Sequence, residues 1–156
     1  MSRKHSFVTL SEEQTLAWYQ HLVRALHGYA LALALSAGLS PAEAARLWEN
    51  WHAGLASHPS QTTLQMIEQQ AKQIAEVFAL THGEEHVQIE QQDETWLVEV
   101  TIADREPLER YGASLELHTQ WVAEQVRLVC EPKGIRCSVW LDQETPSLHL
   151  SLQADR

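Results

Sequence analysis

The fold is decided by the stretch AKQIAEVFALTHGEEHVQIEQQ, residues 71–92, because the spacing of its apolar residues changes inside it. Before Gly83 the apolar residues recur every three or four positions, which is the repeat of a helix. After Gly83 they mostly alternate with polar residues, which is the repeat of a half-buried strand. The chain is therefore predicted to be helical up to this glycine and rich in strands after it.

The same patterns extend in both directions from Gly83. They predict helices over about 11–38, 40–58, 61–82 and 113–131, and strands over about 86–92, 96–102, 135–141 and 148–152. Short turns within each strand pair predict two antiparallel hairpins. We therefore expect a single α+β domain over 1–156, with a helical part at about 11–83 and a sheet-containing part at about 86–153. Its four-stranded antiparallel sheet should carry helices on one face.

The first predicted helix has more apolar surface than a chain of this size can readily cover. Its second half, Ala30 to Leu35, is apolar all round, and a helix with no polar face is expected to be buried on most sides. A second copy of the chain would cover the remainder, so we expect a homodimer through this helix or through the outer face of the sheet, where Trp140 should lie. The seam of the helix follows at alternating spacings of three and four: Leu16, Tyr19, Val23, Leu26, Ala30, Leu33 and Ala37.

Composition narrows the range of partners. The chain has 156 residues and a formal charge of −10, and it has no basic cluster beyond Arg3-Lys4-His5. Binding to phosphate backbones or anionic membranes needs such clusters, so neither nucleic acid nor a membrane is an expected partner. The apolar run Tyr29 to Leu39 is about half the length that spans a bilayer, and the N-terminus lacks the apolar core of a secretion signal. We expect a cytoplasmic protein with reduced cysteines.

Six tryptophans and nine histidines supply candidate ligand-binding residues. Aromatic side chains wall the usual small-molecule cavity, and histidines on the same helices can orient a polar group of the ligand or ligate a haem. The alternative is that these aromatic residues only fill the core. The residues predicted to bind an apolar small molecule are Trp48, Trp51, His52, His118 and Trp121, whereas the cofactor, if any, is unknown.

The segment His82-Gly83-Glu84-Glu85-His86 is the densest group of metal-capable side chains. His82 and His86 are candidate ligands of zinc or a similar ion. The zinc-protease pattern places a glutamate second, where this chain has Gly83. The alternative is a histidine at the negative end of a helix, followed by a solvated acidic turn.

Cys130 and Cys137 form the second candidate group. A pair this close can bridge, bind metal with histidine, or supply one thiolate, but alternation with Ile135 and Val139 favours a core position for Cys137. A helix that runs into Cys130, then Gly134 and then Cys137 at the start of an apolar strand resembles the close of the four-vinyl-reductase-like domains, which share a TRAPP-like fold. That resemblance implies a dimerising, small-molecule-binding domain.

No motif in the sequence names a reaction. There is no nucleophile elbow or glycine-rich phosphate loop, and Asp104, Glu106 and Glu109 are typical of a solvated loop. We therefore expect a non-catalytic small-molecule-binding or interaction module that acts as a homodimer, for example a sensor. The alternative is a small hydrolase-like or metal-dependent enzyme that uses histidine-carboxylate or cysteine chemistry.

Overall fold

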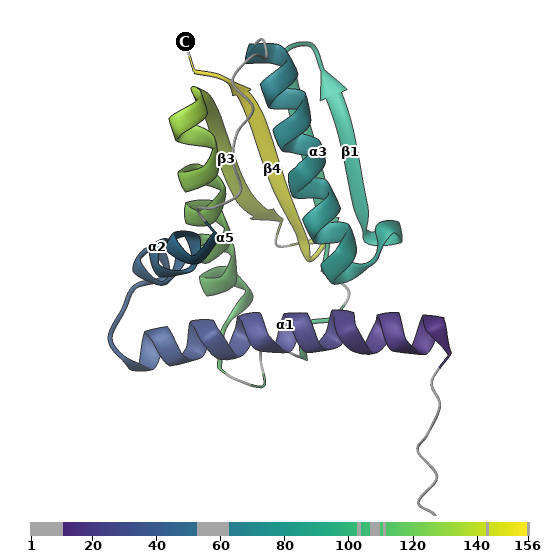
Figure 1. Cartoon of the computed structure of the whole chain (residues 1–156), viewed down its shortest axis with the longest axis vertical. Coiled ribbons are helices and arrows are strands. Elements are labelled where there is room, and N and C mark those ends of the chain that lie inside the picture. The colour runs from purple at the N-terminus through teal and green to yellow at the C-terminus, as the bar shows by residue number, and fades with distance from the viewer. Residues whose placement is uncertain are drawn as a thin grey trace, which may run out of the picture.

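The computed structural model describes residues 11–52, 63–102, 104–106, 110, 112–142 and 144–155, and it describes no side chain from 48 to 52. In this part of the chain, helices precede and interrupt a four-stranded sheet (Figure 1). The elements run in the order α1 (Glu12–Ser36), α2 (Pro41–His52), α3 (Thr63–His82), β1 (Val87–Gln92), β2 (Thr95–Thr101), α5 (Leu115–Cys130), β3 (Ile135–Asp142) and β4 (Ser147–Ala154). The predicted α+β class and four-stranded antiparallel sheet are confirmed.

The two hairpins are joined through their second strands. The strand order is β1-β2-β4-β3, and each neighbouring pair is antiparallel. The β1–β2 hairpin turns at Asp93, whose φ of 53° lies in the left-handed region that aspartate tolerates. β2 then pairs with β4, so that Val98 lies opposite Leu150 at the centre of the sheet. α5 connects the two hairpins.

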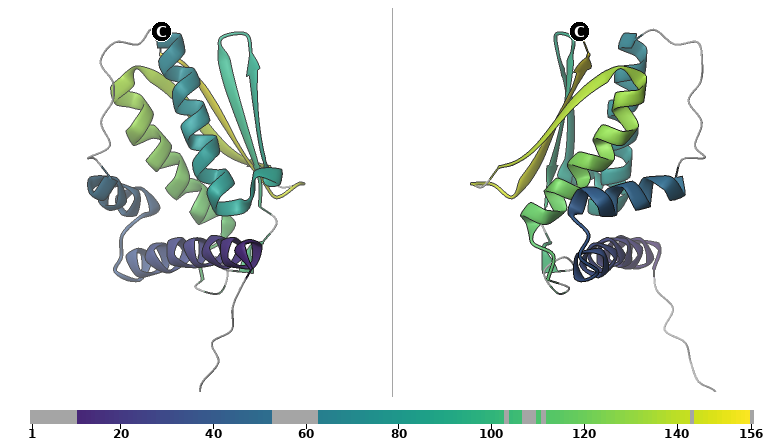
Figure 2. Two further views of the ribbon diagram at one scale, coloured as in Figure 1. Left: turned by 45° about the vertical axis from the view of Figure 1, so that its right-hand side comes forward. Right: turned by 90° about the vertical axis from the view of Figure 1, so that its left-hand side faces the viewer.

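The helices gather on one face of the sheet. α3 and α5 lie across that face, α2 packs on α5, and α1 runs past the ends of both covering helices (Figure 2). The opposite face carries no helix in the part of the chain that the structure describes. The molecule therefore has a covered sheet face and an uncovered one, as strict alternation in the strands predicts.

The core lies between the covered face of the sheet and the two helices above it. Leu148, Leu150 and Leu152 of β4 are fully buried, whereas His149 and Ser151 between them lie on the other face. Residues of β2 alternate in the same way. The core beneath α3 and α5 also contains Ile67, Ala71, Val98, Val100, Ile102, Trp121, Val122, Val126, Cys130 and Ile135.

α1 begins and ends at the residues that the sequence indicates. The side chain of Ser11 accepts from the backbone N–H of Gln14 at 3.1 Å, and the Gln14 side chain accepts from the N–H of Ser11 at 3.0 Å. This reciprocal capping box satisfies two donors that the first turn would otherwise leave unpaired. At the other end, Gly38 adopts a φ of 84°, which stops the helix.

The predicted seam of α1 faces away from the rest of the chain. Leu16 is 54% exposed, Tyr19 56% and Leu26 52%, while the buried residues of the helix, Gly28 and Leu31, lie on another side. The expectation that this helix has more apolar surface than one chain covers is confirmed, but the expectation that its second half is buried on most sides is not. No single described helix is long and apolar enough to span a membrane. α1 and the start of α2 reach the required length and apolarity only when taken together, and the chain bends by 118° between them.

Most described element boundaries lie within about two residues of the sequence prediction, and the differences around the first strand and the fourth predicted helix have local causes. His86 belongs to a 3₁₀ turn over Glu84–His86, so the first strand begins one residue later, at Val87. The fourth predicted helix begins at Leu115 and not at 113, because Ser114 caps it by accepting from the N–H of Leu117 at 3.2 Å. A second 3₁₀ turn follows that helix before the third strand.

We expect truncation of a central β4 side chain to destabilise the fold strongly. Leu150→Ala removes a fully buried side chain and leaves a cavity, which costs about 2–5 kcal/mol of unfolding free energy. Leu80→Ala is the matched control, because Leu80 is 70% exposed on α3 and should cost less than about 0.5 kcal/mol. Urea unfolding at one protein concentration measures both. Equal losses would contradict the placement of the core.

Candidate functional site

Of the five residues predicted to bind a ligand, two lie side by side in the structure. His118 and Trp121 lie one turn apart on α5, both buried, with ring centroids 5.7 Å apart. Trp48, Trp51 and His52 lie on the backbone of α2, but their side chains are outside the described residues. The structure therefore supports a shared location for two of these five residues and does not address the other three.

His118 and Trp121 lie at a junction of three helices, where each of the other two contributes a histidine. His27 of α1 meets Trp121 edge to face, with ring centroids 5.3 Å apart. His82 ends α3 beside Phe78, with centroids 6.0 Å apart, and it is close enough to His27 and His118 for their charges to interact. We call His27, His82, His118 and Trp121 the histidine junction.

Helix ends place two of these histidines. The backbone N–H of His118 donates to the carbonyl of Ser114 at 3.0 Å, so His118 lies in the first turn of α5. α3 ends at His82 because Gly83 follows it with a φ of 104°, a conformation that favours glycine. The two helices therefore present one imidazole each where the end of α3 approaches the start of α5.

Arg24 links α1 to the same place. Its Nη1 donates to the carbonyl oxygen of Thr81 at 2.6 Å, and its Nη2 lies 3.5 Å from a carboxylate oxygen of Asp104. A guanidinium at the C-terminal end of α3 satisfies a carbonyl there and interacts favourably with the helix dipole. Asp104 also lies 3.9 Å from Nδ1 of His21, so this carboxylate forms the outer rim of the junction.

The sequence argument did not identify Arg24. A usable signal was present, because Arg24 is the only Lys, Arg, Asp or Glu between Glu13 and Glu43. A lone charge in so apolar a helix indicates a fixed partner, since an unpaired charge is costly to bury. The side chain is 15% exposed, in agreement with that inference.

Burial holds the imidazoles of His82 and His118 neutral at physiological pH. Desolvation, followed by the charges of Arg24 and His27, lowers the pKa of His82 to about 4. Desolvation, followed by the charges of His27 and His82, lowers the pKa of His118 to about 3. Neutral imidazoles can pack against Trp121 without mutual repulsion, so the closed junction depends on their staying uncharged.

Two buried nitrogens at the junction have no hydrogen-bond partner. These are Nδ1 of His118 and Nε of Arg24. Unpaired buried polar atoms are rare in folded proteins because each costs free energy comparable to a lost hydrogen bond. The two atoms are the chemical features of this site that a polar ligand group could satisfy.

The second predicted metal ligand lies outside this arrangement. His86 is in the 3₁₀ turn beyond α3, with its Nε2 3.7 Å from a carboxylate oxygen of Glu85. Among the described residues, no group of three or more His, Cys, Asp or Glu is placed to hold a metal ion. The hypothesis of a metal at His82 and His86 thus finds no third ligand in that part of the chain.

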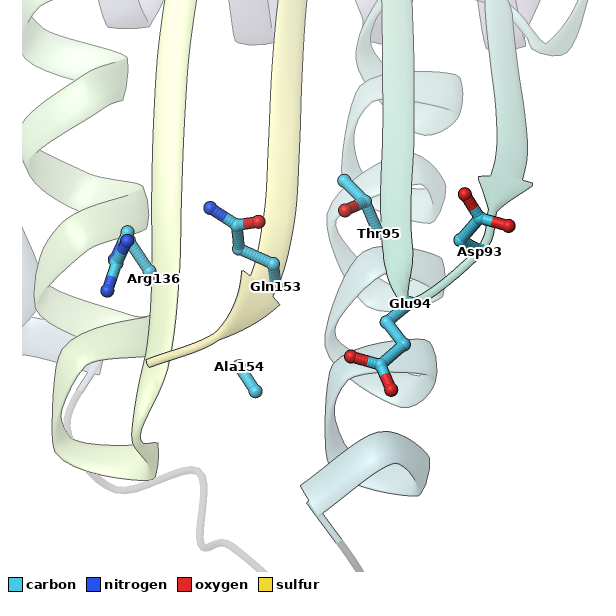
Figure 3. A pocket seen from close by; sticks show the side chains of 6 residues that line it. All are labelled: Asp93, Glu94, Thr95, Arg136, Gln153 and Ala154. Carbon is cyan, nitrogen blue, oxygen red and sulfur yellow. The ribbon is translucent and has the colours of Figure 1, made fainter. Parts of the chain in front are cut away.

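Two open pockets lie elsewhere on the described surface. Figure 3 shows the first, a hollow of about 580 Å³ at one end of the sheet, lined by Asp93, Glu94, Thr95, Arg136, Gln153 and Ala154. The second follows the outer side of α3 and is lined by Gln65, Glu68, Gln69, Lys72, Gln73 and Glu76. Both linings are predominantly polar, and neither contains a predicted ligand-binding residue, so neither matches the apolar cavity expected from the aromatic residues.

Comparison with known proteins adds no assignment to this geometry. No protein-family model, curated protein or solved structure matches the chain significantly. The functional argument therefore depends on the residues themselves.

The buried histidines predict a loss of stability in mild acid. The unfolded chain binds protons near pH 6.5, while the folded chain resists protonation to about pH 4 at His82 and about pH 3 at His118. Between these values the unfolded state holds more protons, so the free energy of unfolding falls as the pH falls. Between about pH 7.5 and 5.5, His118→Leu should lose about 1.4 kcal/mol less than the wild type.

Urea unfolding at the two pH values measures this difference. Each protein is compared with itself, so a general change in stability caused by the substitution cancels. An identical loss in both proteins would contradict a buried, neutral His118.

Proposed function

We propose that this protein is a non-catalytic interaction module that functions as a homodimer through α1. The observation that carries the proposal is the apolar surface that α1 leaves uncovered. Large side chains on this helix, each between one third and three fifths exposed, are Leu16, Trp18, Tyr19, Val23, Leu26, Tyr29 and Leu33. They leave on the order of several hundred Å² open, while a stable interface takes about 800 Å² from each partner.

The spacing of these residues favours a helix as the occupant. Leu16, Val23 and Ala30 are seven residues apart, and Tyr19, Leu26 and Leu33 form a second series with the same interval. These are the a and d positions of a heptad repeat, which an opposing helix fills with its own knobs. The seam continues through three heptads, so the pattern matches a paired helix better than an isolated surface contact.

The identity of the occupant follows from symmetry. A second copy offers the same seam with the same repeat, and a twofold interface needs only such a self-complementary patch. The helix is held against its own chain on another side, by Leu31 in the core and by Arg24 at the end of α3. The seam is therefore presented on an element whose orientation is already fixed, which lowers the entropic cost of association.

A second role, the binding of a small ligand, is favoured by one observation at the histidine junction. Nδ1 of His118 and Nε of Arg24 are buried without hydrogen-bond partners among the described residues, and His118 lies beside the aromatic ring of Trp121. A ligand with one polar group and an apolar body would suit these surroundings. The enzyme alternative has less support, because the described junction has neutral imidazoles but no carboxylate bonded to His118 that would orient it as a base.

The dimer is tested by the mass of the protein in solution. At tens of micromolar the wild type should sediment as a dimer, and Leu26→Glu should raise the dissociation constant about a hundredfold or more, because it places a charge from each copy in the apolar seam. Leu64→Glu is the matched control. Leu64 is 55% exposed, a fraction similar to the 52% of Leu26, and it lies in the first turn of α3. Figure 1 shows that α3 starts at the end that is far from α1.

The control should sediment like the wild type. A monomeric wild type would end the proposal, and so would an equal effect of the two substitutions. Circular dichroism confirms that both variants are folded before the comparison is made.

Ligand binding is tested by native mass spectrometry of protein purified without denaturation. We expect an added mass on the wild type that is absent from His118→Leu. A wild type whose mass equals that of its sequence would contradict a tightly retained ligand at the junction, and would leave the dimer proposal unaffected.

A further inference from the structure

Two cysteines meet where α5 passes into β3. Cys130 is the last residue of α5 and Cys137 is the third residue of β3, and neither is in a disulfide. Their thiols are close enough for an interaction between them to shift the pKa of both, and α5 packs along β3. The sequence predicts a core position for Cys137, and in the structure Cys137 is partly buried and packs against the core cluster that contains Cys130.

The two thiols differ in access to solvent. Cys130 is fully buried, whereas Cys137 is only partly buried at the edge strand β3. A reagent from solution therefore reaches the sulfur of Cys137 first. Cys130 lies behind it, in the position of a second thiol that can attack once the first has reacted.

The charges around the pair also favour reaction at Cys137 before Cys130. The hydrogen bond from the Cys130 thiol, together with the guanidinium of Arg127, lowers the pKa of Cys137, while burial and the carboxylate of Glu131 oppose this. The shared hydrogen bond and burial raise the pKa of Cys130, with a smaller opposing effect of Lys133. The thiolate, which is the reactive form of a cysteine, is thus favoured on the more accessible sulfur.

We propose that Cys130 and Cys137 form a dithiol site that small peroxides oxidise reversibly to an intrachain disulfide. The thiolate of Cys137 attacks one peroxide oxygen and the O–O bond breaks. The other oxygen leaves as hydroxide or, from an organic hydroperoxide, as alkoxide, and it is protonated to water or to an alcohol. The sulfur is then a sulfenic acid. Cys130 attacks that sulfur and gives up its proton, the S–O bond breaks, and a second water leaves as the S–S bond forms.

Two thiols and one peroxide thus yield one disulfide and, for hydrogen peroxide, two waters. A thiol reductant reverses the change by exchange. The described residues offer no competing metal use for the pair, because no group of three or more metal-capable side chains includes it. The closeness of the two thiols, on elements that pack together, distinguishes this site from two separate core cysteines, since a disulfide forms only between side chains that can approach each other.

The experiment uses the reduced full-length protein and hydrogen peroxide. The chain has two cysteines, so Cys130→Ser and Cys137→Ser each leave a single thiol and serve as matched variants. The wild type should lose both thiols and the mass of two hydrogens, and a peptide map should show Cys130 linked to Cys137. Dithiothreitol should restore both thiols. In Cys130→Ser, dimedone should trap a sulfenic acid on Cys137, while Cys137→Ser should react at least tenfold more slowly.

Three results would overturn the proposal. The first is a wild type whose two thiols stay reduced under peroxide until the protein is unfolded. The second is oxidation that links two chains instead of the two cysteines of one chain. The third is equal reactivity of the two single-thiol variants, which would mean that the environment of Cys137 confers nothing. The proposed dimer through α1 predicts none of these three results, so either proposal can fail without the other.

Discussion

The structure depends on the burial of one row of leucines on the strand β4. This strand is paired on both sides, and its inward leucines, Leu148, Leu150 and Leu152, are fully buried. Water can be removed from that row only if α3 and α5 lie across it, and burial of each such side chain is worth about 1.5–3 kcal/mol. The positions of the two helices then follow. The end of α3 meets the start of α5, which brings His82 toward His118, and the end of α5 meets β3, which brings Cys130 to Cys137.

α1 obeys a different constraint. It contributes Leu31 to the core, and Ala34 and Leu35 pack against that core. The guanidinium of Arg24 adds a polar contact with the last turn of α3. A helix that is apolar on more than one side cannot bury all of its sides against the rest of one small domain. The chain satisfies one side and leaves the heptad seam open, and a contiguous exposed seam of this kind is typical of a surface that another molecule covers.

The spacing of apolar residues and the local capping motifs correctly predicted the helices and strands. The change at Gly83, the alternation in β2 and β4 and the capping box at Ser11 gave the right elements, because each is a local rule. The orientation of α1 was not available in this way: Ala30 to Leu35 are apolar in every direction, so the helix has no polar side to mark where solvent lies. The side that faces inward is instead set by partners distant in sequence, among them Thr81, whose carbonyl accepts from Arg24.

The candidate site was likewise predicted only where its residues lie on one helix. His118 and Trp121 share one face of one helix, and their spacing on α5 was enough to group them. His27 joins them from α1 and His82 from α3, and no spacing rule relates residues on separate helices. The end of α3 was correctly predicted from Gly83, but the pattern could not say which helix would start beside it. Sites made where helices meet are therefore the part of a structure that a single sequence reveals least.

α1 contributes residues to both the histidine junction and the exposed seam, and the two cannot move independently. One side of the helix carries Arg24 and His27 into the junction, and another carries the seam that we propose a second copy covers. A rigid helix cannot shift one side without shifting the other, so any change that opens the junction also displaces the seam. By linkage, a partner that fixes the seam must in turn stabilise the closed junction by the same free energy. Protonation of buried imidazoles favours the open form, because desolvation opposes charge there. Acid should therefore weaken association as well as folding, and a dimer should resist acid better than its monomer.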